Sequence, residues 1–439
     1  MRILLWLAAS LLSFATYGQN LIQSGPMNGY SEIREALIWV QTTEACEVEL
    51  VYWPDSLPSE KMRSEPVHTQ KSEAFTAKLI ADGVEPGGRY GYSIYANGEN
   101  QTPDLNLYFH TQELWQYRRD PPNFTIAAGS CAYINEPEYD RPGKGYGGNY
   151  RIFDKIADAN PDMMLWLGDN FYLRQADWFT QTGIFARYTH TRSLLEMQRL
   201  LRTTHHYAIW DDHDFGPNDS NRSFPHRDKT RKAFELFWGN NGYGVDGNGG
   251  ITSAFQFNDV HFFLLDNRWN RNAASLKTDT PQVFGKAQID WLIESLKYSR
   301  APFKIVATGG QILNDAAVYE NYANYPQERD LLLNRIADEG IKGVIFLTGD
   351  RHHAELIKMK VNGTLLYDIT TSPLTAGTHA GGDEETTNRV EGTLYNGHNF
   401  ALLEVSGPRK NREMKVRMMT ADGEEVWSRV ISASEWHKD

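Results

Sequence analysis

Clusters of polar and potentially reactive side chains recur along the chain, each directly after a short apolar run. They are Gly129-Ser130-Cys131, Gly168-Asp169-Asn170-Phe171-Tyr172, Asp211-Asp212-His213-Asp214, Asp266-Asn267-Arg268 and Gly349-Asp350-Arg351-His352-His353. Carboxylates this concentrated repel one another unless cations lie among them. A thiolate, an imidazole and a phenolate suit a transition metal, whereas surplus carboxylate and amide oxygens suit Ca²⁺ or Mg²⁺. The residue types therefore predict two metals of different hardness.

The apolar runs before these clusters are typical of strands that alternate with helices in an α/β domain. The predicted strands are Phe124–Ala128, Met163–Leu167, Ala208–Trp210, His261–Leu265, Lys304–Thr308 and Gly343–Thr348. The predicted helices are Tyr150–Ala159, Ile184–Arg199, Lys229–Trp238, Lys286–Tyr298 and Gln327–Glu339. Ligands of α/β sheets bind outside the carboxyl ends of the strands, so we expect the clusters to meet at one rim. Asp169 and Tyr172 share a strand-end turn, so the carboxylate could bridge both metals while the phenol reaches one of them.

The first part of the chain, residues 20–112, has the pattern of an all-β domain. Its predicted strands are Ala36–Thr43, Cys46–Trp53, Ala74–Ile80, Arg89–Ala96 and Leu105–Thr111. Tyr90 follows a tight turn and resembles the tyrosine corner of immunoglobulin-like and fibronectin type III sandwiches; an unrelated hairpin is the alternative. We therefore predict a β-sandwich over residues 19–112, a linker over 113–122 and the α/β domain over 123–439.

The N-terminus has the pattern of an export signal. Arg2 precedes an apolar run from Ile3 to Ala15, and Thr16 and Gly18 fit a small-residue cleavage site. The alternative is a membrane anchor, but the run is short and no later apolar stretch reaches about 18 residues. We predict a signal peptide over residues 1–18 and export to the periplasm or the exterior.

The bulk composition narrows the possible partners. The net charge is −12 and there is no block of basic residues, which argues against a nucleic-acid-binding protein. The two cysteines, Cys46 and Cys131, fall in different predicted domains, so we do not expect a disulfide between them. The oligomeric state cannot be predicted from the sequence.

Five motifs in a fixed order give the chain a family resemblance. They are Gly-Ser-Cys at 129–131, Leu-Gly-Asp-Asn-Phe-Tyr at 167–172, Trp-Asp-Asp-His-Asp at 210–214, Leu-Asp-Asn-Arg at 265–268 and Leu-Thr-Gly-Asp-Arg-His at 347–352. In order and spacing they resemble the PhoD-like alkaline phosphatases and phosphodiesterases, a branch of the calcineurin-like metallophosphatases. The resemblance implies an α/β/β/α metallophosphatase sandwich, preceded by a β-sandwich domain.

The resemblance also implies a set of cofactors and ligands. By position, Cys131, Asp169, Tyr172 and His352 would hold Fe³⁺, with Asp169 bridging to Ca²⁺. The residues implied for calcium are Asp212, Asp350 and Asn218. His213 would be the acid that contacts the phosphoryl oxygen or the leaving group. Zn²⁺ and Mn²⁺ are the alternative metals.

The chain departs from the family pattern at three places. Founding members carry a twin-arginine export signal, whereas Arg2 stands alone here. This favours export of the unfolded chain, with the metals loaded outside the cytoplasm. Asp214 stands where Glu is common. The tract from Gly216 to Ser220 is divergent, which weakens the assignment of Asn218.

The expected activity is hydrolysis of phosphate monoesters or diesters by water that the metals activate. An arginine would stabilise the developing charge, with Arg268 and Arg351 as the candidates and Arg268 placed in the predicted catalytic pair with His213. The alternative for Arg268 is that it pairs with Asp266 or another carboxylate. Two Gly-rich stretches, Asn135–Asn149 and Pro217–Gly250, are predicted to border the site. Histidines that match no motif are expected to be ordinary core or surface residues: His205, His206, His261, His353, His379 and His398.

Two alternatives belong to other functional classes. Cys131 could be the nucleophile of a thiol hydrolase, activated by His213 or His352, although this leaves the carboxylates and Tyr172 without a role. The chain could also be a catalytically silent binding protein on the same scaffold, with the sandwich responsible for recognition.

Overall fold

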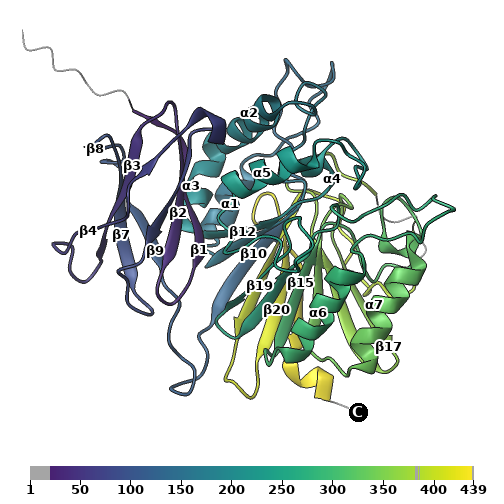
Figure 1. Cartoon of the computed structure of the whole chain (residues 1–439). Helices are drawn as coiled ribbons and strands as arrows, with labels where there is room; N and C mark the ends of the chain where they lie inside the picture. Colours follow the sequence, from purple (N-terminus) through teal and green to yellow (C-terminus); the bar gives the residue numbers. More distant parts are fainter. Residues whose placement is uncertain (1–19, 381–383, 385, 438–439) are drawn as a thin grey trace, which may run out of the picture.

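The computed structural model describes residues 20–380, 384 and 386–437. It contains two β-sheets that face each other, with helices on their outer faces, and an all-β part beside them (Figure 1). This confirms the predicted fold class. The predicted signal peptide, residues 1–18, lies outside the described residues.

The first sheet has nine strands and contains three of the predicted site strands. In spatial order the strands are β21 (Glu425–Ser432), β20 (Glu413–Thr420), β19 (Asn399–Ser406), β10 (Phe124–Gly129), β11 (Met163–Leu167), β12 (His205–Ile209), β1 (Ile22–Ser31), β2 (Ala36–Thr42) and β6 (Thr76–Ala81). Strands β10, β11 and β12 are parallel, with Ala128 opposite Leu165 and Leu165 opposite Tyr207. Their carboxyl ends therefore lie at one edge of the sheet.

The second sheet has six strands, most of them parallel. They are β13 (Ser253–Phe257), β14 (Val260–Leu264), β15 (Phe303–Thr308), β16 (Val344–Thr348), β18 (Thr364–Thr370) and β17 (Glu355–Val361). Side chains alternate between two cores: Phe262 and Leu264 point into the core between the sheets, whereas Phe263 and Leu265 pack beneath the outer helices. A strand buried on both faces explains why these runs are almost continuously apolar.

The described residues form seven α-helices, which lie outside or above the sheets (Figure 1). They are α1 (Ile152–Asp158), α2 (Gln181–Arg192), α3 (Leu195–Thr203), α4 (Asp212–Phe215), α5 (Arg227–Phe237), α6 (Lys286–Tyr298) and α7 (Pro326–Asp338). Helices α6 and α7 cover the second sheet (Figure 1). The single helix predicted over Ile184–Arg199 is wrong, because Leu194 adopts an extended conformation and separates α2 from α3.

The all-β part adds six strands to the N-terminal strands of the large sheet. They are β3 (Glu47–Pro54), β4 (Met62–Arg63), β5 (Val67–His68), β7 (Arg89–Ala96), β8 (Glu99–Asn100) and β9 (Leu107–His110). The phenol oxygen of buried Tyr90 accepts a hydrogen bond of 2.7 Å from the backbone N–H of Glu85. This is the bond of a tyrosine corner, as predicted.

The large sheet continues across the predicted domain boundary. Strand β1 pairs in parallel with β12, with Asn28 opposite His205. A Cβ atom on Gly29 would lie 3.1 Å from the Cα of Gly239, so glycine allows the two backbones to meet. The indole N–H of Trp39 also donates to the carbonyl of Leu236 at 2.8 Å. The all-β part is therefore packed closely against the α/β part, and the domain limits stay a prediction.

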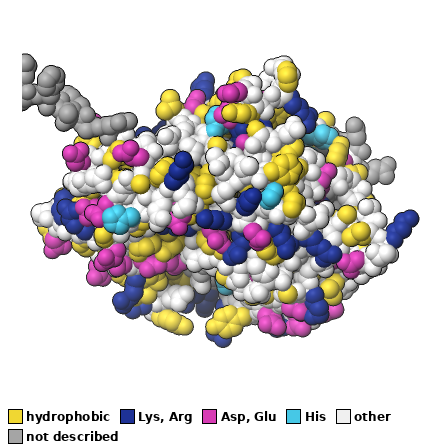
Figure 2. Space-filling model, turned by 45° about the horizontal axis from the view of Figure 1, so that its top comes forward, with side chains coloured by type: hydrophobic (Ala, Val, Ile, Leu, Met, Phe, Trp, Pro, Cys, Tyr) yellow, Lys and Arg dark blue, Asp and Glu magenta, His cyan; other side chains and the backbone are white. Residues whose placement is uncertain are grey.

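The visible surface carries charged side chains of both signs. In Figure 2 acidic and basic side chains are interspersed over the visible face, and no large basic patch is seen there. None of the helices in the described ranges has the length and apolar character that a membrane crossing requires.

Candidate metal centre

The predicted clusters converge at the carboxyl ends of the central strands. Cys131 follows β10, Asp169 follows β11, Asp212 follows β12, and Asp350 and His352 follow β16. Four of them have left-handed backbones, with φ of 59° for Cys131, 50° for Asp169, 64° for Asp350 and 54° for His352. Such conformations cost about 1–3 kcal/mol each in non-glycine residues and cluster at functional sites. These tight turns direct the side chains toward one region at the carboxyl ends of the strands.

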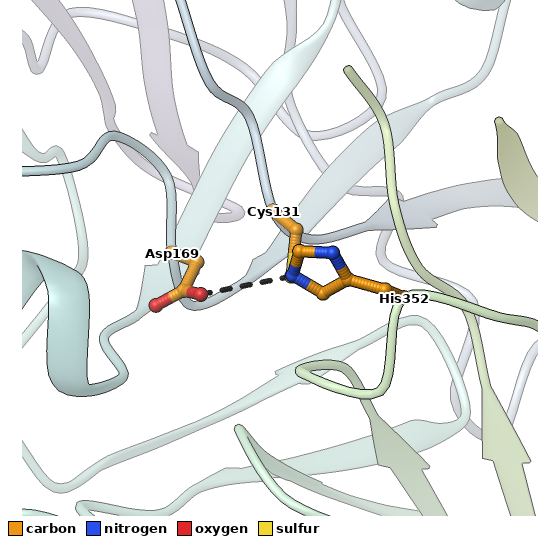
Figure 3. A group of neighbouring side chains, drawn as sticks. All are labelled: Cys131, Asp169 and His352. Atoms are coloured by element: carbon orange, nitrogen blue, oxygen red, sulfur yellow. Dashed lines mark hydrogen bonds between the residues drawn. The ribbon is translucent and has the colours of Figure 1, made fainter. Parts of the chain in front are cut away.

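The first candidate metal group consists of Cys131, Asp169 and His352. Their donor atoms lie within 4.8 Å of one another, and Figure 3 shows the three side chains meeting from separate segments. The Cys131 Sγ lies 3.7 Å from the Asp169 Oδ2. The Tyr172 hydroxyl lies 3.3 Å from the His352 Nε2, so a fourth potential ligand joins this group.

The second candidate group consists of Asp169, Asp212 and His213, again with donor atoms within 4.8 Å. Asp169 belongs to both groups, as expected of a bridging carboxylate. Asp350 and the exposed Asn218 line the same pocket without belonging to either group. Five of the seven predicted ligands therefore line one pocket, with Asn218 exposed, and the other two, Cys131 and Tyr172, lie next to Asp169 and His352 without lining it.

The pocket above the two groups has a volume of about 660 Å³. Its wall includes Tyr146 from the first predicted border loop and Asn218, Asp219 and Asn221 from the second. Another part of the wall comes from residues in two segments that were not predicted to contribute, 271–274 and 319–325. The pocket is larger than the metal groups alone require, so there is room for a substrate.

Comparison with known proteins agrees with this geometry. A model described as PhoD-like phosphatase matches residues 126–406 of the 439-residue chain. The chain belongs to the PhoD-like phosphatase family. Residues 19–114 match a second model, described as a domain of unknown function (DUF7800). The second match covers the all-β part of this PhoD-like protein and assigns no role to it.

Among curated proteins, alkaline phosphatase D of Bacillus subtilis (strain 168) is 22% identical over 332 residues, which is 64% of this chain and 54% of that protein. The chain thus spans about half the length of this relative. A solved structure of PhoD covers 95% of this chain and 90% of its own, with a TM-score of 0.75 and 16% identity. The structure of purple acid phosphatase PPD1 from yellow lupin (Lupinus luteus) seeds matches with a TM-score of 0.71 and 10% identity. This match covers 93% of our chain and 74% of the lupin chain. These two matches establish the fold.

The electrostatics of the PhoD-like site fit bound cations. Burial, followed by the neighbouring Asp212 and Cys131, raises the pKa of Asp169 well above its usual value. Burial and neighbouring acids raise the pKa of Asp350 to about 8, and burial and Asp350 raise that of Cys131 to about 12. Sulfur, carboxylate, imidazole and phenol donors thus meet where anions repel one another, and cations would relieve that repulsion. The residues present fit a two-metal centre.

His213 belongs to the second metal group, and its role as the acid stays a prediction. It lines the pocket, its Nε2 is 3.8 Å from the Asp212 Oδ2, and its ring centroid is 4.1 Å from that of Tyr172. Its backbone N–H donates to the Asp169 Oδ1 at 3.2 Å. Burial lowers the pKa of His213, and the Asp212 carboxylate opposes that shift. His213 can therefore approach a substrate while its backbone N–H helps to hold the Asp169 carboxylate that the two groups share.

Arg268 is not among the residues that line the pocket. Its side chain is fully buried behind the metal groups, where it forms an ion pair with Asp211 and lies 3.5 Å from the Asp212 Oδ1. Its Nη1 donates to the Glu320 carboxylate at 3.0 Å. Asp211, Asp212 and Glu320 form a third acidic group, and Arg268 supplies the positive charge among them. The position of Arg268 thus gives no support for a direct contact with phosphate.

Sequence reasoning missed several residues of the pocket wall: Arg271, Tyr319, Glu320, Tyr325 and His379. Arg271 offered a weak signal, since it lies three positions after Arg268 on the segment that follows β14. His205 and His206 are buried, as expected for core histidines, and each has a ring nitrogen within hydrogen-bonding distance of a backbone carbonyl.

Proposed function

We propose that this chain is an exported metal-dependent phosphoesterase that hydrolyses phosphate monoesters, diesters or both. The observation that carries the proposal is the sharing of the Asp169 carboxylate by two metal-binding groups beside a pocket of about 660 Å³. A two-metal site of this kind suits in-line displacement at phosphorus. Export rests on the N-terminal pattern, and a mature secreted form that begins at Gln19 would support it.

We propose Fe³⁺ for the group of Cys131, Asp169, Tyr172 and His352, because thiolate, phenolate and imidazole suit a transition metal. We propose Ca²⁺ for the oxygen ligands of Asp212, Asp350 and Asn218, with Asp169 shared. When bound, the cations would polarise the phosphoryl oxygens and make an attacking water more acidic. Zn²⁺ or Mn²⁺ are the alternatives.

The chain's own residues then have separate tasks. Asp169 holds the two metal groups at a fixed spacing. His213, at the pocket wall, donates a hydrogen bond to the phosphoryl oxygen or the leaving group. Asp214 and Asp211 form a capping box at the start of α4, which fixes the direction of the turn carrying Asp212 and His213.

Two observations favour this function over the alternatives. The Cys131 side chain is fully buried, so a substrate in the pocket would not reach its sulfur for a nucleophilic attack. A silent binding protein would have no need of a complete donor set, yet thiol, phenol, imidazole and carboxylate donors are all present and converge.

Metal removal tests the proposal directly. The purified protein is expected to contain transition metal and calcium by elemental analysis, and to hydrolyse p-nitrophenyl phosphate or bis(p-nitrophenyl) phosphate. Chelation should lower either activity by about 10³-fold or more, since the cations supply several kcal/mol of stabilisation in the transition state. Adding metals back should restore it, and a chelator saturated beforehand with metal serves as the control. Activity that survives complete metal removal would contradict the proposal.

A further inference from the structure

Two arginines after strand β14 share one carboxylate. Arg268 and Arg271 lie three positions apart on the segment that leaves the carboxyl end of β14. Glu320 accepts a hydrogen bond from the Arg268 Nη1 at 3.0 Å, and its Oε1 also lies 2.7 Å from the Arg271 Nη2. Glu320 therefore links a fully buried guanidinium to a second one closer to the pocket.

The two arginines differ in what surrounds them. Arg268 also forms an ion pair with Asp211 and lies 3.5 Å from Asp212, so acids surround its charge. For Arg271, Glu320 is the carboxylate within ion-pair distance in the described part of the chain, and Arg268 shares it. Arg271 lines the pocket together with Asp212 and His213, whereas Arg268 does not belong to that lining. Arg271 is thus the better placed of the pair to meet an anion.

The third candidate, Arg351, is already engaged. Its Nη1 donates to the Gln311 Oε1 at 3.1 Å and to the Asn321 Oδ1 at 2.5 Å. Its Nη2 forms an ion pair with Glu384. Although Arg351 also lines the pocket, phosphate would have to displace this carboxylate to gain a bidentate contact.

Arg271 is held in one orientation by its surroundings. Its side chain is 7% exposed, and its guanidinium carbon lies 5.0 Å from the ring centroid of Tyr325. Its backbone N–H donates to the Arg268 carbonyl at 3.2 Å, and its carbonyl accepts from the Arg222 N–H at 2.9 Å. A planar guanidinium that is oriented in advance loses little conformational freedom when it binds phosphate oxygens.

We propose that Arg271 binds the phosphoryl group of the substrate, and that Glu320, backed by Arg268, is the positioning residue that orients it. The inference rests on the proposed function for the identity of the ligand, a phosphate ester. Arginine binds phosphate through two parallel N–H···O bonds, which fixes the orientation of the phosphoryl group as well as its position. Arg268 then acts behind the site, through Asp211, Asp212 and Glu320.

The test compares Arg271→Ala, Arg271→Lys and Glu320→Gln in the metal-loaded protein, with Arg222→Ala as the matched control. Arg222 is an exposed arginine nearby that pairs with Asp279. We expect Arg271→Ala to raise KM for p-nitrophenyl phosphate and the inhibition constant of inorganic phosphate by roughly 10- to 100-fold. Arg271→Lys should recover part of this loss. Glu320→Gln should raise both constants by roughly tenfold, and Arg222→Ala should change them by less than about twofold.

Inorganic phosphate is also added in a thermal-shift assay, because that readout does not require turnover. If the wild type is active and Arg271→Ala keeps its phosphate inhibition constant and its phosphate-induced shift, the inference is overturned and the proposed function stands. If the wild type is inert but Arg271→Ala abolishes the shift, the proposed function fails and Arg271 remains a phosphate ligand. Should Arg271→Ala not fold, Arg271→Lys and Glu320→Gln decide in the same way: unchanged phosphate binding in both overturns the inference.

Discussion

Asp169→Asn is expected to lower kcat/KM for phosphate esters by about 10³-fold or more and to release metal from both groups. Its carboxylate contributes to both metal groups, so a single substitution weakens both sites at once. Asparagine has nearly the same size as aspartate but lacks its charge and one of its acceptor oxygens. The variant should therefore lose cation binding while its packing is preserved. Steady-state kinetics and elemental analysis of the purified variant measure the two effects.

Asp219→Asn is the matched control for this prediction. Asp219 lines the same pocket but is exposed and belongs to neither metal group. Its backbone N–H, which donates to the Asp212 Oδ2 at 2.8 Å, is retained in the variant. We expect the control to stay within a few-fold of the wild type. An Asp169→Asn protein that kept both metals and more than about a tenth of the activity would show that no bridging carboxylate is needed.

The convergence of the candidate ligands could be predicted from the sequence because one physical rule places them. Parallel strands that are buried on both faces read as short apolar runs, and their carboxyl ends lie at one edge of a sheet. Cys131, Asp169, Asp212 and His352 each follow such a run within a few residues, and the structure brings all four together. Local sequence was sufficient there, since each residue is placed by its own strand.

The choice between the arginines could not be made from sequence. Arg268 and Arg271 lie on the same segment, and their directions depend on Glu320, which comes from a loop about 50 residues later in the chain. The pairing of β1 with β12 was equally hidden, because it joins segments that the composition separates into different domains. Strands β17 to β21 were not predicted at all, although they complete both sheets. Each of these features depends on long-range contacts, which no local pattern specifies.

Cys131→Ala is expected to release the transition metal and to lower activity by about 10²-fold or more. It should also remove the visible charge-transfer absorption that we expect from Fe³⁺ bound to the Cys131 sulfur. The reason lies in the protonation of the thiol. In the metal-free chain, burial and the neighbouring Asp350 raise the pKa of Cys131 to about 12, so the sulfur stays protonated at neutral pH. A cation that binds the sulfur must displace this proton, and the thiolate that results should give charge-transfer absorption with Fe³⁺.

The two cysteines of the chain make this prediction sharply testable. Cys46 is also free and buried, but it packs in the core of the all-β part, so Cys46→Ala is the matched control and should keep colour, metal content and activity. A nucleophilic role for Cys131 would instead leave metal content unchanged while activity disappears. An active, colourless wild type that holds zinc and is unaffected by Cys131→Ala would exclude the iron assignment. Asp169, Asp212 and His213 would then still define a phosphoesterase centre, because their convergence does not depend on which metal lies beside Cys131.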